Sequence, residues 1–261
     1  MKKTMKLLIL VLVLFSLHSC GVRKLIVDNA AGLLSYQVTR HIPLYGKQKD
    51  DLGKDIEKFL NQSKPIANEI LPVIDRIELN NHSEVEVLYK KIETFYDRLA
   101  NDFSALMAKY MALLDSKQQK DLFEGFDDEN RKISNIEKKK RLDDIEDRFK
   151  KLLGSMTGPQ KQLIRDHEDF FLSRAKDRLK RRIQLHEKLR WIYKQDISLD
   201  SRTNEITDAF RSYQSSRTNG SKNLDILKSL LPTLTKNQKE HFRNHVEDIK
   251  ELLKYFLSID Y

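Results

Sequence analysis

Cysteine is all but absent from this sequence, since Cys20 is the only one among 261 residues. A single thiol cannot form a disulfide within the chain, which excludes the small disulfide-stapled folds. Glycine and proline are also scarce, with 8 and 5 copies, where average usage would give about 18 and about 13. This shortage of turn formers argues against sandwiches, β-barrels and doubly wound folds.

Charged residues are abundant instead, at 33% of the chain against a norm of about 25%, and apolar residues make up 39%. From Val85 to Leu113 apolar side chains recur every three or four residues, which is the period of an amphipathic helix. No stretch shows sustained alternation of apolar and polar residues. The sequence therefore predicts an all-α fold, an elongated bundle of antiparallel helical hairpins without a sheet.

The predicted helices are separated by the few glycines and prolines. They span 23–41, 47–63, 65–79, 84–113, 116–137, 139–153, 158–195, 202–215, 221–230 and 236–258. We expect residues 1–19 to form a signal peptide, residues 20–43 a lipidated N-terminus with a loosely packed tether helix, and residues 44–261 the helical domain.

The N-terminus has the layout of an export signal. Three lysines precede an apolar run from Leu7 to Phe15, which is too short to cross a bilayer. Leu17, Ser19 and Cys20 resemble the lipobox of bacterial lipoproteins, in which the cysteine becomes the first mature residue and carries the lipid. This resemblance predicts acylation of Cys20. The alternative is an ordinary signal peptide followed by a coincidental cysteine.

Export changes the meaning of the chain's positive charge. Loss of the three signal lysines would lower the formal net charge from +9 to about +6. A basic exported protein does not meet nucleic acid, so we expect its counter-charges to be anionic envelope polymers or acidic proteins. Gly21, in place of an aspartate after Cys20, favours an outer-membrane anchor facing the periplasm, and surface exposure stays open. The covalent lipid is the only cofactor that we expect.

One helix-start pattern recurs along the chain: an apolar residue, a capping residue, two variable residues and glutamine. The capping oxygen accepts a first-turn N–H, and the glutamine reaches back to the N–H of the capping residue. The segment Leu44–Gln48 is a degraded copy. The three clear pairs are Asp115 with Gln118, Thr157 with Gln160, and Thr235 with Gln238. Each glutamine falls on the predicted buried stripe, where its amide needs partners.

The lipobox together with these widely spaced starts is similar to an uncharacterised family of bacterial helical lipoproteins, a domain of unknown function. The L-T-x-x-Q element also resembles the paired motif of the periplasmic Spy/CpxP family of helical chaperones and stress regulators. Leu234, Thr235 and Gln238 match that motif fully, whereas Asp115 and Met156 depart from it. The resemblance implies an all-α fold, and it leaves the motifs as structural caps or as part of a client-binding surface.

Signatures of catalysis and metal binding are missing. The sequence has no nucleophile elbow, no P-loop and no dinucleotide fingerprint. His241 and His245 are four residues apart, but two ligands do not make a zinc site. We therefore predict no catalytic residues and no metal ligands.

The segment 174–194 is strongly basic. Its predicted buried stripe holds Leu172, Ala175, Leu179, Ile183, His186 and Tyr193. Two interpretations of the cationic side chains remain open. They pair with acids on neighbouring helices, or they form a surface for anions or acidic clients. The residues in question are Arg178, Lys180, Arg181 and Arg182.

These observations predict a membrane-anchored lipoprotein that works by binding and not by catalysis. Its partners, besides the membrane, would be unfolded or acidic envelope proteins, or anionic envelope polymers. The alternative is a structural lipoprotein with one fixed protein or cell-wall partner.

Overall fold

The computed structural model describes residues 20–76, 82–216 and 220–261, and over these ranges the fold is all-α, as predicted. The described residues form 11 α-helices and no strand. The helices are α2 (Cys20–Asp28), α3 (Ala30–Thr39), α4 (Lys47–Ile74), α5 (His82–Ala112), α6 (Ser116–Ser134), α7 (Lys138–Leu153), α8 (Gly158–Asp166), α9 (Glu168–Tyr193), α10 (Leu199–Ser215), α11 (Gly220–Leu230) and α12 (Lys236–Ser258), and a 3₁₀ turn, η1 (Leu231–Thr233), joins the last two.

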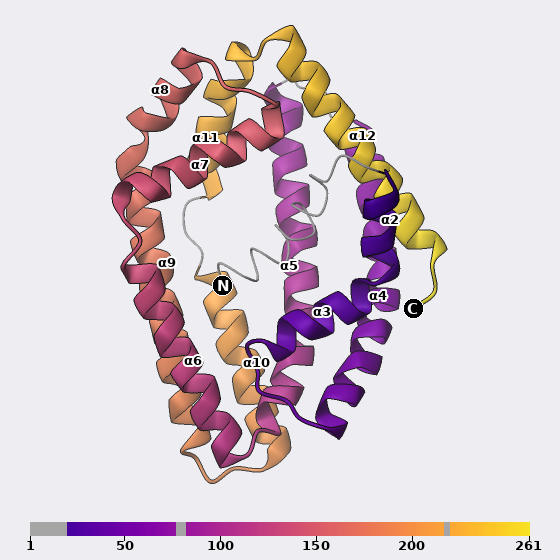
Figure 1. Ribbon diagram of the computed structural model, residues 1–261, viewed down its shortest axis with the longest axis vertical. Coiled ribbons are helices and arrows are strands. Elements are labelled where there is room, and N and C mark those ends of the chain that lie inside the picture. Colours follow the sequence, from indigo (N-terminus) through magenta and orange to yellow (C-terminus); the bar gives the residue numbers. More distant parts are fainter. Residues whose placement is uncertain (1–19, 77–81, 217–219) are drawn as a thin grey trace.

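The bundle is elongated, with α5 running along much of its long axis (Figure 1). Helices α6 and α9 lie on one side of the molecule, and α2, α4 and α12 lie on the other. Neighbours in sequence form the packed pairs α4 with α5 and α9 with α10. The most extensive contact joins α5 to α10, which are far apart in the chain. The predicted bundle is thus present, but its largest helix–helix contact does not join helices that are adjacent in sequence.

Two hydrophobic clusters hold these helices together. The larger contains fully buried residues of α4, α6, α9 and α10, among them Leu52, Leu122, Leu189 and Ile206. The smaller contains Val85 and Leu153 with leucines of α11 and η1. The core is therefore divided along the long axis.

The recurring helix-start motifs lie at the two ends of the molecule. A complete capping box is present at Asp115/Gln118, at Thr157/Gln160 and at Thr235/Gln238, as predicted. Each of these glutamines is at most 2% exposed. Figure 1 shows the first residues of α4 and α6 near the lower end, and those of α8 and α12 near the upper end.

The glutamines meet in two pairs, one at each end. Gln160 Nε2 donates to Gln238 Oε1 at 2.9 Å, and Gln238 Nε2 returns a bond to Gln160 Oε1 at 2.8 Å. At the opposite end, Gln118 Nε2 donates to Oε1 of Gln48, in the degraded copy, at 2.6 Å. Each motif therefore caps its own helix and also bonds to the start of a distant helix.

The prediction that a helix ends before Pro65 was wrong. Helix α4 continues through Pro65 and Pro72 to Ile74. An internal proline costs about 3 kcal/mol, but Ile56 and Ile66, on either side of Pro65, are both buried. Their packing keeps one continuous apolar face across the proline. The predicted end at residue 79 lies outside the described residues.

The single helix predicted over 158–195 was also wrong, because it is interrupted at His167. The ring Nδ1 of His167 lies 2.8 Å from the carbonyl oxygen of Leu163, which the backbone N–H of His167 would bond in a continuous helix. That N–H bonds to Ile164 instead. A side chain inserted into the backbone ladder is a common cause of such breaks.

Residues 20–43 do not form the loosely packed tether that we predicted. Val38 and Ile42 are buried in the larger cluster, and α2 and α3 pack against α12 and α4. Tyr255 also bonds Asp28 at 2.7 Å. The apolar residues of this segment complete the core, so it belongs to the folded body. Over the described residues, no helix has the length and apolar character needed to cross a membrane.

Candidate binding site

A cavity of about 460 Å³ lies between the two sides of the bundle. Small-molecule sites generally span about 300–1,000 Å³. Its wall is mostly apolar and is formed mainly by helices α2, α3, α4, α5, α6, α9, α10 and α12. Representative lining residues are Ile70, Leu99, Phe103, Met107, Leu185 and Phe256. Because α9 and α12 lie on opposite sides of the molecule (Figure 1), the cavity extends across its width.

The α9 side of the cavity carries a buried charge pair. Arg182 is 4% exposed, and its Nη2 donates to Oε2 of Glu129 on α6 at 2.6 Å. The other carboxylate oxygen of Glu129 lies 3.4 Å from Nδ1 of His41. All three side chains line the cavity. A charge removed from water requires such a partner, so one wall of an otherwise apolar space is polar.

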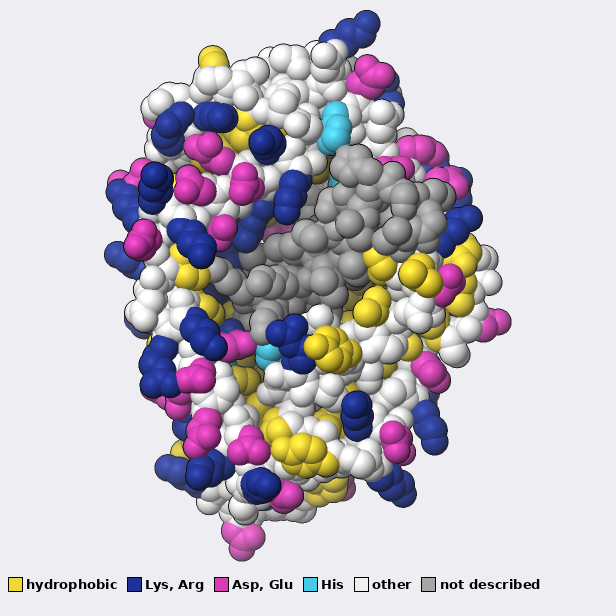
Figure 2. All heavy atoms as spheres, viewed as in Figure 1, with side chains coloured by type: hydrophobic (Ala, Val, Ile, Leu, Met, Phe, Trp, Pro, Cys, Tyr) yellow, Lys and Arg dark blue, Asp and Glu magenta, His cyan; other side chains and the backbone are white. Residues whose placement is uncertain are grey.

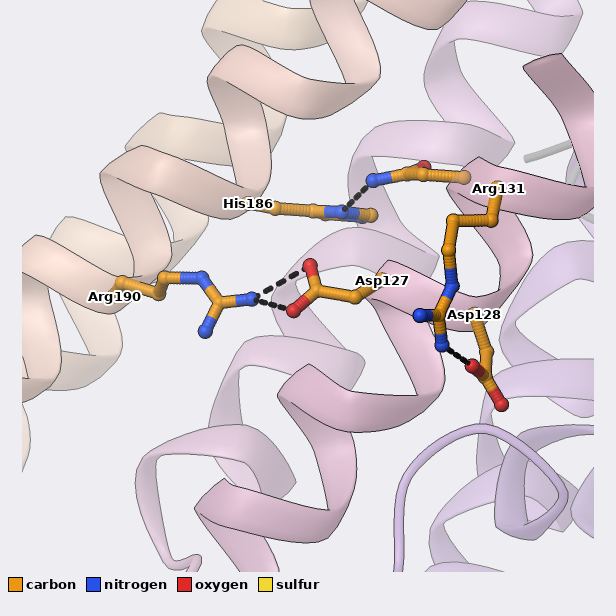
Figure 3. A network of polar contacts seen from close by, with 6 residues as sticks. Asp127, Asp128, Arg131, His186 and Arg190 are labelled. Atoms are coloured by element: carbon orange, nitrogen blue, oxygen red, sulfur yellow. Dashed lines mark hydrogen bonds and ion pairs between the residues drawn. The ribbon is translucent and has the colours of Figure 1, made fainter.

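His186 lies one turn from Arg182 and is held in a neutral form. Its ring stacks on Phe126, with centroids 3.9 Å apart and planes at 10°, and its Nδ1 lies 3.1 Å from Nδ2 of Asn130 (Figure 3). Burial, reinforced by the charge of Arg182, lowers the pKa of His186 to about 3. This imidazole therefore stays uncharged at neutral pH, and it lines the cavity as a neutral aromatic ring.

Outside this polar wall, one exposed ion pair joins α6 to α9, and another lies within α6. Nη2 of Arg190 lies 2.7 Å from both carboxylate oxygens of Asp127, and Arg131 pairs with Asp128 within α6 (Figure 3). Figure 2 shows basic and acidic side chains interspersed along the flank where Figure 1 places these helices. Mixed charge of this kind is typical of a solvated face.

The basic segment does not present its cations uniformly to solvent, and the predicted apolar stripe is correct at His186, which is 6% exposed, but wrong at Ile183. Ile183 is 38% exposed, whereas Arg182 is buried together with Leu185 and Leu189. The inward face of α9 also includes the buried Arg182 and, four residues earlier, the partly buried Arg178. Lys180 is exposed. The four cations therefore do not form one outer patch.

Two of these arginines have no ion-pair partner among the described residues. Burial, with the neighbouring Arg174 next in effect, lowers the pKa of Arg178 to about 10. The guanidinium carbon of Arg181 lies 5.6 Å from the centre of the Tyr213 ring. Its Nε and Nη1 atoms are buried and find no hydrogen-bond acceptor in the described part of the chain. The internal-pairing interpretation thus holds for Arg182 alone.

The remaining predicted sites lie elsewhere. Cys20 is the first residue of α2, and its side chain is outside the described set. The paired glutamines do not line the cavity. Nε2 of His241 lies 3.3 Å from the carbonyl oxygen of Lys151. Among described residues, no group of three or more His, Cys, Asp or Glu side chains has a metal-binding arrangement.

Sequence reasoning missed the cavity and its polar wall. The available signal was the spacing of Arg178, Arg182, Leu185 and Leu189, which is helical and mixes arginine with leucine. A buried stripe chosen by hydropathy alone leaves out the two arginines and therefore misses this pattern. Neither a protein-family model, nor a curated protein, nor a solved structure matches this chain.

Proposed function

We propose that the chain is an envelope lipoprotein, anchored through an acylated Cys20 in the outer membrane and facing the periplasm, that works by binding an apolar ligand without catalysis. The observation that carries the proposal is the cavity of about 460 Å³ with its mostly apolar wall. Filling such a space with hydrocarbon removes apolar surface from water on both partners, which is favourable by about 25 cal/mol per Å².

Side chains that line the cavity are held in place by the hydrophobic core. Leu185 and Met107 line it and are each 7% exposed, and both belong to the larger hydrophobic cluster. Side chains fixed by a packed core need little reorganisation when a ligand enters, which preserves affinity. This favours a ligand site over a transient gap between helices.

A solution experiment tests the proposal with the mature chain carrying Cys20→Ala, so that no lipid or detergent accompanies the protein. The uncharged probe N-phenyl-1-naphthylamine fluoresces strongly only in apolar surroundings. We expect saturable binding near one probe per chain. Ala100→Phe should lower the affinity at least tenfold, because Ala100 lines the cavity and the new ring would occupy it.

Ala105→Phe is the matched control, since Ala105 lies on the same helix, is exposed and does not line the cavity. It should bind the probe as the parent does. Far-ultraviolet circular dichroism checks that both variants keep the fold. Absence of saturable binding, or equal binding by both variants, would reject the proposal.

A further inference from the structure

The inward face of α9 carries more positive charge than its surroundings balance. Arg174, Arg178 and Arg182 follow one another at intervals of four residues, and Arg181 flanks them. Glu129 pairs with Arg182, and Glu93 is the acid whose field reaches Arg174. Arg178 and Arg181 form no ion pair with a described residue. Uncompensated charge that is partly removed from water is costly, and a bound anion would relieve that cost.

The guanidinium groups also have free donors for such an anion. Nε and Nη1 of Arg181 are buried without an acceptor in the described chain, and so is Nε of Arg182. Arg174 donates to the side chain of Asn223 on α11, which fixes its position beside Arg178. Guanidinium groups bind carboxylate and phosphate through paired hydrogen bonds. The chemistry that fits these donors is an oxyanion.

This cationic cluster, formed by Arg174, Arg178 and Arg181, borders the cavity. Tyr213 lines the cavity, and its ring centre lies 5.6 Å from the guanidinium carbon of Arg181. Arg182, next to Arg181 in sequence, lines the cavity directly. From this edge the apolar wall continues to Leu252 and Phe256 of α12, on the opposite side of the bundle.

We propose that the ligand is an anionic amphiphile, whose oxyanion head binds Arg178 and Arg181 while its acyl chain occupies the cavity toward α12. The inference rests on the proposed function, because it needs the cavity to be a binding site, and it adds the ligand class and the residues that select it. An acyl chain alone would satisfy the apolar wall but leave the arginines unpaired. An anion alone would leave the cavity unused.

The test compares hexadecanoic acid with its uncharged methyl ester, each displacing N-phenyl-1-naphthylamine from the mature chain. We expect the acid to bind at least tenfold more tightly than the ester. The double variant Arg178→Gln with Arg181→Gln should remove that preference by weakening the acid alone. Lys176→Gln with Lys180→Gln is the control, because both lysines are exposed on the same helix, and it should keep the preference.

The outcomes separate the two proposals. Equal affinity for acid and ester, or an unchanged acid preference in the double arginine variant, overturns the anionic amphiphile while probe binding still supports the cavity. Failure of the probe itself to bind rejects the proposed function. Binding of a poly-glutamate peptide that depends on these arginines but does not compete with the acid would assign them to an acidic polypeptide instead. If the double variant does not fold, Arg178→Gln and Arg181→Gln are tested singly, and each should reduce the preference for the acid over the ester by a smaller factor.

Discussion

Replacing Gln238 with alanine should destabilise the protein far more than loss of an ordinary helix cap. Gln238 is 1% exposed, and its side-chain amide takes part in four hydrogen bonds. Its Nε2 donates to Ser155 O at 2.9 Å and to Gln160 Oε1 at 2.8 Å, and its Oε1 accepts from Gln160 Nε2 at 2.9 Å and from the N–H of Thr235 at 3.0 Å.

Each hydrogen bond contributes about 0.5–1.5 kcal/mol net, and a buried partner left unsatisfied costs about 1–3 kcal/mol. Gln160 would keep its bonds to the N–H of Thr157 and to the carbonyl oxygen of Thr233. All four bonds of the Gln238 amide are lost, however, so we expect a loss of about 3–5 kcal/mol. Thr235→Ala, which removes one capping acceptor, should cost only about 0.5–2 kcal/mol.

Urea unfolding followed by circular dichroism measures both losses, with Gln184→Ala, at an exposed position of α9, as a control expected within about 0.5 kcal/mol. The double variant Gln160→Ala with Gln238→Ala should cost less than the sum of the single variants by about 1–3 kcal/mol, because each single variant already breaks both bonds between the two amides. Additive losses, or a Gln238→Ala cost equal to that of Thr235→Ala, would refute the pairing.

Three further predictions address separate features. In the same unfolding assay, Gly154→Ala should destabilise by about 1–3 kcal/mol, because Gly154 has φ +77° and an added Cβ would lie 2.9 Å from Cγ of His241. Gly53→Ala is the control: its added Cβ meets nothing within 4 Å, so this substitution within a helix should stabilise by about 0.5–1 kcal/mol. The pKa of His186 is lowered to about 3 in the folded chain from its usual 6.5, so its contribution to stability is present above pH 6.5 and is lost as the pH falls. His186→Gln should remove about 2 kcal/mol of the decline between pH 7 and pH 5, and an unchanged decline would contradict this. Cys20→Ala should abolish acylation, measured by incorporation of labelled palmitate, and normal labelling would remove the lipoprotein assignment.

The fold class followed from the sequence because helix periodicity is a local property. The capping boxes at Thr157 and Thr235 were predictable for the same reason, since all of their atoms lie within four residues. The pairing of Gln160 with Gln238 could not be foreseen, because 78 residues separate them and no local pattern states which helix ends meet. The continuity of α4 through Pro65 likewise depends on packing from α5 and α12.

The candidate site was the least predictable feature. Its polar wall brings together His41, Glu129 and Arg182 from three separate parts of the chain. The stripe predicted for α9 left Arg182 out, because hydropathy assumes that a buried face is apolar. Arg182 is buried because it pairs with a carboxylate from another helix, Glu129 of α6. Only the tertiary arrangement brings that carboxylate to Arg182.

The position of an acyl chain in the bound state tests the role of the cavity most directly. Hexadecanoic acid bearing a photoreactive diazirine at its terminal carbon can be crosslinked to the mature chain, and the labelled peptides mapped by mass spectrometry. Labels on Ile70, Leu252 or Phe256, lost when unlabelled acid competes, are the predicted result. Labels confined to exposed apolar side chains such as Trp191, 50% exposed, and Leu199, 48% exposed, would contradict it.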